Sequence, residues 1–145
     1  MSIMSNYGGG YKAGITLRGV PISILYPGKV FWVSNSTTAG NYLPGSRVGS
    51  NTEWREGSFN KPFSTIDYAI GRCTASRGDV IFVKPNHAET ISNATTLLFD
   101  VAGVAVIGLG SGSNRPTLTF DAATANIPVS AAYMAIYNFL FVPSG

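Results

Sequence analysis

The sequence predicts an all-β fold, a short parallel β-helix with a short N-terminal capping helix and an extended N-terminal arm. The composition points this way, because only 12% of the residues are charged while 17 are Gly and 8 are Pro, which disfavours helical bundles and coiled coils. Short apolar runs also alternate with turn residues along most of the chain. The three most apolar runs, centred on Ile81, Val106 and Ile136, lie 25 and 30 residues apart, a spacing typical of repeat architectures.

Residues 1–28 form the predicted arm. Glycines and prolines interrupt any regular element there, and the apolar residues between them roughly alternate as in edge strands. The arm is also basic, since residues 1–52 contain four basic residues and no acidic one, whereas residues 53–145 have a net charge of −1. Such an arm is expected to lie along a partner, or else to fold back on its own domain. The expected contact residues are Lys12, Ile15, Leu17, Arg18, Val20, Ile22, Ile24 and Leu25.

Residues 29–145 form the predicted domain, which begins with a β-branched and aromatic strand at Lys29–Ser34. A long loop follows at residues 35–59, and loops of this length are usually functional or held by a partner. Tyr42 and Trp54 are possible contact residues in this loop. The alternative for Trp54 is that it pins the loop to the core of its own domain.

A short amphipathic helix is predicted at Ser64–Cys73, with Ser64 as the N-cap and Asp67 as an acidic capping-box partner. Val80–Val83 is then a continuous apolar run, as in strands that are covered on both faces. The helix is expected to cap the first coil and to protect its edge. Further strands are predicted at Glu89–Ser92, Thr96–Asp100, Val104–Ile107, Thr117–Phe120, Ile127–Ser130 and Met134–Val142.

Two stretches carry a resemblance to a known family. The sequence KPFSTIDYAIGRCTASRGDVIFVKPNHAETI, residues 61–91, resembles the first coil of right-handed parallel β-helix proteins of the pectin-lyase-like type. DVAGVAVIGLGSGSNRPTLTFDAA, residues 100–123, is similar to the next coil of such domains in bacteriophage structural proteins. The resemblance implies a right-handed coil and a relationship to virion decoration proteins, head or tail fibres and tailspikes, which are often trimeric.

Few residues could form a catalytic site. His87 and Glu89 lie two positions apart, so on a strand they would face the same side and hydrogen-bond; a structural role is the simpler interpretation. Asp100 and Asp121 are one coil apart and could stack as a carboxylate pair, but strand-end turn formation explains both. Residues 77–79 spell Arg-Gly-Asp where a turn is needed. We therefore expect no catalytic residues, no metal and no cofactor.

The C-terminal segment YMAIYNFLFVPSG, residues 133–145, is uncharged and strongly apolar. A β-helix of so few coils would leave an apolar end, and monomers rarely expose large contiguous apolar areas. We therefore expect self-association through Tyr133, Tyr137, Phe139 and Phe141, which share one parity on a continuous strand. The alternative is that these aromatics pack under the protein's own loops. Three-fold symmetry is implied by the resemblance alone.

These observations together predict a non-enzymatic virion structural protein. The expected role is that of a capsid decoration or cement protein, which binds the major capsid protein or another virion protein through its arm and stabilises the head. Its expected location is the capsid exterior, after synthesis in the host cytoplasm. The alternative is a head or tail fibre module, or tailspike module, that recognises host glycans. The basic charges are too dispersed for a nucleic-acid partner, and no stretch approaches 18 uncharged apolar residues, so no membrane association is expected.

Overall fold

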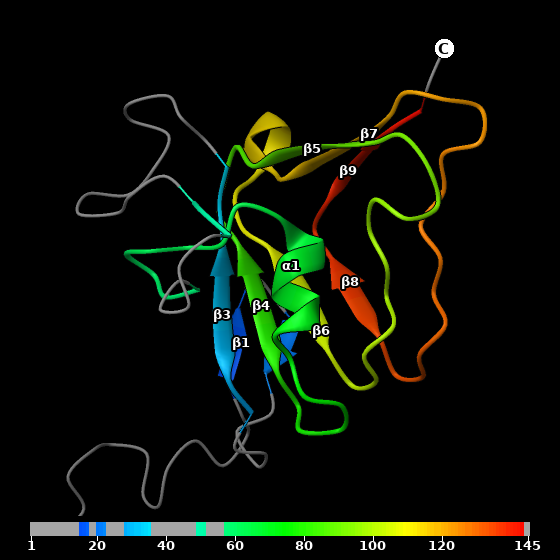
Figure 1. The fold of residues 1–145 in the computed structure, drawn as a ribbon. Coiled ribbons are helices and arrows are strands. Elements are labelled where there is room, and N and C mark those ends of the chain that lie inside the picture. The colour runs from blue at the N-terminus through cyan, green and yellow to red at the C-terminus, as the bar shows by residue number, and fades with distance from the viewer. Residues whose placement is uncertain (1–14, 18–19, 23–27, 36–48, 52–56, 144–145) are drawn as a thin grey trace, which may run out of the picture.

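The computed structural model describes residues 15–17, 20–22, 28–35, 49–51 and 57–143 (Figure 1). The described strands form a two-stranded, a four-stranded and a three-stranded sheet. In chain order the elements are β1 (Ile15–Leu17), β2 (Val20–Ile22), β3 (Val30–Val33), α1 (Ile66–Gly71), β4 (Val80–Val83), β5 (Ala88–Ile91), β6 (Ala105–Gly108), the 3₁₀ helix η1 (Gly112–Asn114), β7 (Thr117–Phe120), β8 (Ala135–Tyr137) and β9 (Leu140–Val142).

The four-stranded sheet contains β3, β4, β6 and β8 in that order, and all its neighbouring strands are parallel. Ile81, Val106 and Ile136, the centres of the predicted repeat, are direct register partners on β4, β6 and β8. Ile81 and Val106 are buried on one face of this sheet, while Phe82 and Ile107 are buried on the other. The prediction that Val80–Val83 is a strand covered on both faces is therefore confirmed.

The three-stranded sheet contains β5, β7 and β9, which are also parallel. The chain passes from a strand of the first sheet to a strand of the second three times, through β4–β5, β6–β7 and β8–β9. From β4 onward, a strand pairs with the next strand of its own sheet about 23 to 30 residues later, so these neighbours are not consecutive in the chain; β3 and β4 are consecutive among the described strands and pair 50 residues apart. Side chains from both sheets and from α1 form the core, which includes Val33, Ile66, Val83, Ile91 and Leu118.

The predicted fold class, an all-β parallel β-helix, is wrong. The described residues form two parallel sheets with a short α-helix, an arrangement closer to mixed α/β folds, and no closed helix of rungs. Between β3 and β4 the described chain contributes α1 and no strand of the three-stranded sheet. The segments after β5 and β7 form no third sheet among the described residues. They are joined by the isolated bridge between Phe99 and Val129 and by a backbone hydrogen bond from the Gly103 N–H to the Ala132 carbonyl.

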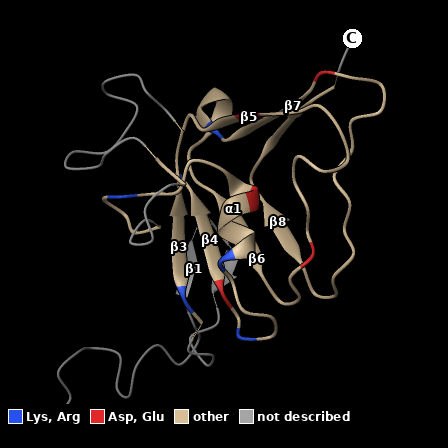
Figure 2. Ribbon diagram, viewed as in Figure 1, with Lys and Arg blue, Asp and Glu red and all other residues tan. Residues whose placement is uncertain are grey.

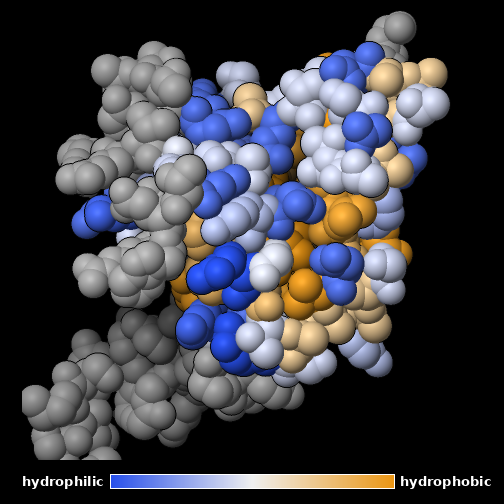
Figure 3. Space-filling model, in the orientation of Figure 1, coloured by the Kyte–Doolittle hydropathy of each residue, from blue (hydrophilic) through white to orange (hydrophobic). Residues whose placement is uncertain are grey.

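Local hydrogen bonding favours an irregular conformation in the segment after β5, which together with the segment after β7 is called the irregular side. The Asn93 side chain accepts hydrogen bonds from the Thr95 N–H at 2.9 Å, the Thr95 hydroxyl at 2.7 Å and the Thr96 hydroxyl at 3.3 Å. Such side-chain turns compete with strand pairing. The predicted strands at Thr96–Asp100 and Ile127–Ser130 reduce to the single bridging residues Phe99 and Val129. Figure 3 shows hydrophobic residues at the surface to the right of α1, on a face that no regular sheet closes.

The predicted capping helix is confirmed in position but shorter, and its cap differs. Thr65, rather than Ser64, is the N-cap, and its hydroxyl accepts a hydrogen bond from the Tyr68 N–H at 3.3 Å. Asp67 does not form a capping box, because its Oδ1 accepts a hydrogen bond at 2.9 Å from the N–H of Leu98 in the segment after β5. The carboxylate therefore connects the helix to the irregular side.

The predicted strand at Met134–Val142 divides into β8 and β9, which belong to different sheets. Asn138 breaks it with a left-handed φ of 62°, a conformation that Asn tolerates better than most residues. Its side-chain amide donates to the carbonyls of Gly108 at 2.8 Å and Gly110 at 3.1 Å. The break changes which side chains face inward, so the parity argument does not hold for Phe139.

Candidate functional site

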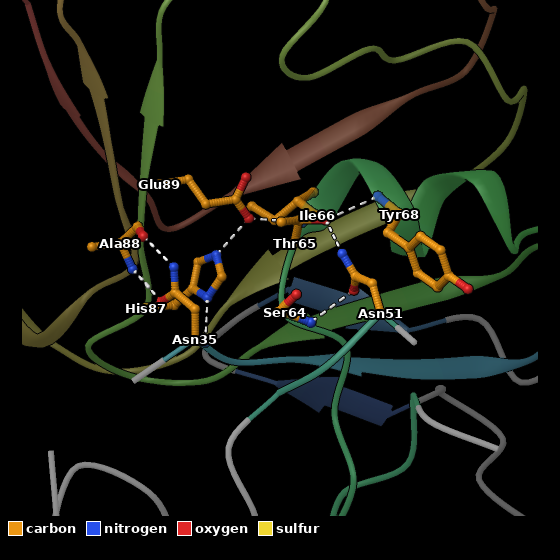
Figure 4. A network of polar contacts seen from close by, with 9 residues as sticks. All are labelled: Asn35, Asn51, Ser64, Thr65, Ile66, Tyr68, His87, Ala88 and Glu89. Atoms are coloured by element: carbon orange, nitrogen blue, oxygen red, sulfur yellow. Dashed lines mark hydrogen bonds and ion pairs between the residues drawn. The ribbon is translucent and has the colours of Figure 1, made fainter. Parts of the chain in front are cut away.

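A buried polar network joins the end of β3, the start of α1 and the start of β5 (Figure 4). At its centre lies His87, which has no exposed surface and directly precedes β5. His87 Nδ1 accepts a hydrogen bond from the backbone N–H of Asn35 at 3.0 Å. Because that nitrogen is an acceptor, the proton of the neutral ring resides on Nε2, which lies 2.6 Å from Oε1 of Glu89 and donates to it.

Glu89 connects this network to the helix. The same Oε1 accepts a hydrogen bond at 2.7 Å from the N–H of Ile66, the first residue of α1. The first N–H groups of a helix have no partner within it, and a carboxylate placed there is electrostatically favourable. The predicted His87–Glu89 hydrogen bond is therefore present, and it orients a carboxylate that anchors α1.

Asn35 covers the edge of the three-stranded sheet. Its side-chain amide donates to the carbonyl of Ala88, and its Oδ1 accepts from the Ala88 N–H at 3.0 Å. This pair of hydrogen bonds imitates one rung of a β-ladder on β5, the edge strand. Edge strands otherwise offer free backbone groups to other chains. The side chain of Asn35 thus protects the edge at this end of the sheet.

A second amide completes the network on the helix side. Asn51 donates through Nδ2 to the Thr65 hydroxyl at 2.9 Å and accepts through Oδ1 from the Ser64 N–H at 3.0 Å. The N-cap is therefore positioned by a residue that lies 14 positions earlier in the chain. These hydrogen bonds are directed at the chain's own backbone and caps, so the arrangement fixes the mutual position of three segments.

The Arg-Gly-Asp turn also binds groups of the protein itself. The buried Asp79 carboxylate accepts hydrogen bonds from the N–H groups of Lys29 at 2.6 Å and Thr74 at 2.7 Å, and from Arg77 Nε at 2.7 Å and Nη2 at 2.6 Å. Burial alone would raise the pKa of Asp79, but the hydrogen bonds from Arg77, Thr74 and Lys29 outweigh it and the pKa lies below its usual value. The carboxylate closes this turn and is not presented to a partner.

Two further residues lie just after β4 and just after α1. Lys84 is buried, and its Nζ donates to the Phe59 carbonyl at 2.5 Å and lies 4.3 Å from the centroid of the Phe59 ring. Burial lowers the pKa of Lys84. Burial also raises the pKa of the Cys73 thiol to about 12, and its Sγ lies 3.3 Å from the Ala69 carbonyl as a donor. Cys73 is therefore a poor nucleophile.

The structure does not bring Asp100 and Asp121 together as a pair of register partners. Asp121 follows β7, and its Oδ2 accepts a hydrogen bond from the Ser92 hydroxyl at 3.0 Å. Asp100 follows the Phe99 bridge, whose partner is Val129. Within the described ranges, no group of three or more His, Cys, Asp and Glu side chains is arranged to hold a metal ion. No helix in the described part of the chain is long and apolar enough to cross a membrane.

Five exposed apolar side chains lie between residues 129 and 142, on the last strands of the two sheets and in the segment before them. We define the C-terminal apolar surface as Val129, Tyr133, Tyr137, Phe141 and Val142, which are 62%, 90%, 42%, 52% and 42% exposed. Three of the four predicted self-association residues belong to it. Phe139, the fourth, is only 8% exposed and packs in the core.

The register shows why this surface is apolar. Phe141 is the partner of Leu118, which is fully buried, and the two residues occupy the same position on β9 and β7. Because β9 and β8 are the last strands of their sheets, a side chain at a core position is half exposed. Tyr137 extends the row formed by Phe82 and Ile107, on the face of the four-stranded sheet opposite Ile81 and Val106. The core is therefore open at this end.

The predicted arm is only partly described. Ile15 and Leu17 lie on β1, and Val20 and Ile22 lie on β2, and these two strands pair antiparallel. The remaining predicted contacts lie outside the described residues, namely Lys12, Arg18, Ile24 and Leu25 in the arm and Tyr42 and Trp54 in the loop. Figure 2 shows charged residues dispersed over the described ribbon rather than gathered in a patch of one sign.

Comparison with models of protein families, with curated proteins and with solved structures found no match. The resemblance to bacteriophage β-helix proteins therefore stays a prediction from the sequence.

Proposed function

We propose that the protein is a non-enzymatic virion structural protein, a capsid decoration protein that acts by assembly. In this proposal it self-associates through the C-terminal apolar surface and binds the major capsid protein, or another virion protein, through its basic and apolar N-terminal arm. Contacts spread over several subunits would stabilise the head through multivalency. The proposed location is the exterior of the capsid.

The observation that carries the proposal is the half-exposed Phe141 at a position equivalent to the buried Leu118. At roughly 200 Å² for a fully exposed aromatic side chain, the exposed fractions of Tyr133, Tyr137 and Phe141 correspond to about 370 Å². Stable interfaces bury about 800 Å² on each partner. The three aromatics would thus supply nearly half of such an interface, before the two valines and the edges of β8 and β9 are counted.

The use of the polar residues supports a non-enzymatic role. His87, Glu89 and Asp79 bind backbone N–H groups of the protein itself. General acid–base catalysis needs a group within hydrogen-bond reach of a substrate, and these three side chains are buried or nearly so.

Co-sedimentation with undecorated capsids of the phage that encodes the chain tests the proposal. Wild type should sediment with the capsids. A variant that lacks residues 1–28, and the full-length double variant Lys12→Glu and Arg18→Glu, should remain in the supernatant. Arg72→Glu is the matched control, because it reverses a charge at an exposed site just after α1. Binding of wild type and both arm variants alike would contradict the role of the arm, and failure of wild type to bind would contradict the capsid assignment.

A second candidate is a head or tail fibre module that recognises host glycans. One observation favours it, namely a shallow pocket of about 360 Å³ lined by Ser76, Gly78, Gly103 and the exposed Tyr133. A glycan screen distinguishes the two candidates. Binding of a surface glycan without its cleavage, together with no capsid binding, would favour the fibre module.

A further inference from the structure

Three turns precede the strands of the four-stranded sheet, and they place a left-handed residue at the same position. Val80, Ala105 and Ala135 are register partners at the start of β4, β6 and β8. Two residues before each of them lie Gly78, Gly103 and Tyr133, with φ angles of 81°, 76° and 58°. Two turns thus use glycine, which adopts this conformation at no steric cost, and the third uses tyrosine.

Tyr133 is costly at this position and gains little from its own chain. A bulky residue in the left-handed region is an outlier that marks strain. The surrounding backbone holds it there, since Gly103 N–H donates to the Ala132 carbonyl at 3.0 Å and Ala135 N–H donates to the Val104 carbonyl at 3.1 Å. The side chain is nevertheless 90% exposed. A ring that is held in a strained turn and projects into solvent indicates a contact outside this chain.

A pocket that could hold such a ring lies directly beside Tyr133. The pocket of about 360 Å³ has Tyr133 as one wall, with Gly78, Gly103 and Ser76 as the others. The two glycines leave space where side chains would otherwise stand. Arg77 lies between two of the lining residues, but its guanidinium is paired with Asp79 at 2.6 Å. The feature is therefore a shallow pocket, formed in part by two glycines, next to an exposed aromatic ring.

We propose that Tyr133 of one copy occupies this pocket on a second copy of the chain. This inference rests on the self-association that the proposed function includes, and it names the contact that holds the copies together. Because the Tyr133 ring and the pocket are adjacent, a rotational symmetry axis that passes near them lets every copy both insert its ring and receive one. Closed symmetric oligomers are built from such reciprocal contacts. The inserted ring would also lie against the Tyr133 of the receiving copy, where aromatic pairs are favourable.

The charge pattern favours a second copy as the occupant. Residues 122–145 contain no charged side chain, so bringing two such segments together causes no like-charge repulsion. The opposite end of the three-stranded sheet is protected by Asn35, which leaves the C-terminal end as the available side of that sheet.

Sedimentation velocity of the full chain over a range of concentrations tests the inference. Wild type should form a closed dimer or trimer. Tyr133→Gly removes the ring and the strain together, so we expect its dissociation constant to rise about 30-fold or more, as for an interface hot spot, while its melting temperature as a monomer rises by a few degrees. If Tyr133 had only a structural role, its replacement would not weaken association while raising the melting temperature.

A variant of the pocket tests the other half of the contact. At Gly103 an added Cβ would meet Ser76 Cα at 3.4 Å, which is ordinary contact, and Asn tolerates the left-handed conformation. Gly103→Asn should therefore fold and fill the pocket, and it should weaken association as Tyr133→Gly does, with no further loss in the double variant. Asn86→Gly is the matched control, because it relieves a left-handed residue with φ 64° in a different turn.

The results separate this inference from the proposed function. An oligomer that is unaffected by Tyr133→Gly and Gly103→Asn would overturn the inference and leave self-association intact. A wild-type monomer at every concentration would overturn both the inference and the self-association part of the proposed function. Perturbation of Tyr133 resonances by an oligosaccharide in a monomeric protein would overturn the inference and favour the fibre module.

Discussion

The opposite pKa shifts of two aspartates, Asp79 and Asp67, predict opposite effects of the same substitution. Asp79 accepts four hydrogen bonds, two of them from backbone N–H groups. In Asp79→Asn, one oxygen becomes an amide N–H₂ that faces the donors of Thr74 and Arg77. A hydrogen bond to a charged group contributes about 1.5 to 3 kcal/mol, and the bonds from the partly exposed Arg77 count for less because solvent screens them. We expect Asp79→Asn to lower the free energy of unfolding by about 3 kcal/mol at pH 7.

Asp67→Asn is the matched control. Burial is the largest influence on Asp67 and raises its pKa, while the hydrogen bond from the Leu98 N–H lowers it and the charges of Asp100 and Glu89 raise it further. The charged form is therefore disfavoured in the folded protein. An asparagine amide oxygen can still accept the Leu98 N–H, so Asp67→Asn should leave the free energy of unfolding unchanged or increase it at pH 7.

The two variants should also differ in their pH dependence. The folded pKa of Asp79 lies below its ordinary value of 3.8, so its stabilisation is fully present above that value and is lost as the pH falls through the folded pKa. The difference in the free energy of unfolding between wild type and Asp79→Asn should therefore become smaller in acid. The folded pKa of Asp67 lies above 3.8, so protonated Asp67 stabilises the fold at low pH and this contribution is lost as the pH rises through the folded pKa.

Urea unfolding followed by tryptophan fluorescence measures these differences between pH 2 and pH 7. Trp32 is a suitable reporter, because its ring packs 4.9 Å from Phe59 and 5.0 Å from Phe82. The slope of the unfolding free energy with urea should not change, since the fold stays the same. The reasoning is refuted if Asp67→Asn lowers the free energy of unfolding as much as Asp79→Asn does at pH 7. It is also refuted if the difference in this free energy between wild type and Asp79→Asn stays constant down to pH 2.

Three further predictions concern the polar network and the thiol. Asn35→Ala should expose the β5 edge, so hydrogen exchange of the Ala88 amide should accelerate by at least tenfold; an unchanged rate would show that Asn35 does not protect this edge. Nitrogen NMR should find the His87 ring with its proton on Nε2, next to Glu89, and a proton on Nδ1 would contradict the hydrogen bond from Asn35. Cys73 should react slowly with a disulfide reagent in the native protein and rapidly in urea, because only the thiolate is reactive; equal rates in both states would contradict the raised pKa.

The regular strands could be predicted from the sequence because apolar runs are a local signal. Val80–Val83 and Thr117–Phe120 were predicted with the bounds that the structure has. The spacing of Ile81, Val106 and Ile136 also identified register partners, since each passage through both sheets returns the chain to the same position on the next strand. Periodicity thus predicted the pairing within the four-stranded sheet.

Periodicity could not predict whether the coil closes, because this depends on competition between strand pairing and side-chain turns. In the segment after β5, the Asn93 side chain forms such a turn with Thr95. The role of Asn138 was missed for a related reason, since one left-handed residue moved Phe139 from the predicted surface into the core. An Asn inside a predicted apolar strand is the local signal for such a break, because Asn adopts the left-handed conformation more readily than most residues.

The buried polar network was only partly predictable. The His87–Glu89 hydrogen bond follows from their two-residue spacing. Asn35 and Asn51 act on residues 53 and 14 positions away, and no local pattern reports such partners. Lys84 is a comparable case, because a lysine next to an apolar run is usually exposed, whereas here it is fully buried.

The central claim is that the protein acts by assembly through the C-terminal apolar surface. The most direct test measures the mass of the full chain in solution for wild type and for the double variant Tyr137→Ser and Phe141→Ser, and then their co-sedimentation with capsids. We predict a closed oligomer for wild type, and for the variant a folded monomer with weaker capsid binding, because multivalency is lost. A monomeric wild type, or a variant that assembles and binds capsids as wild type does, would contradict the claim.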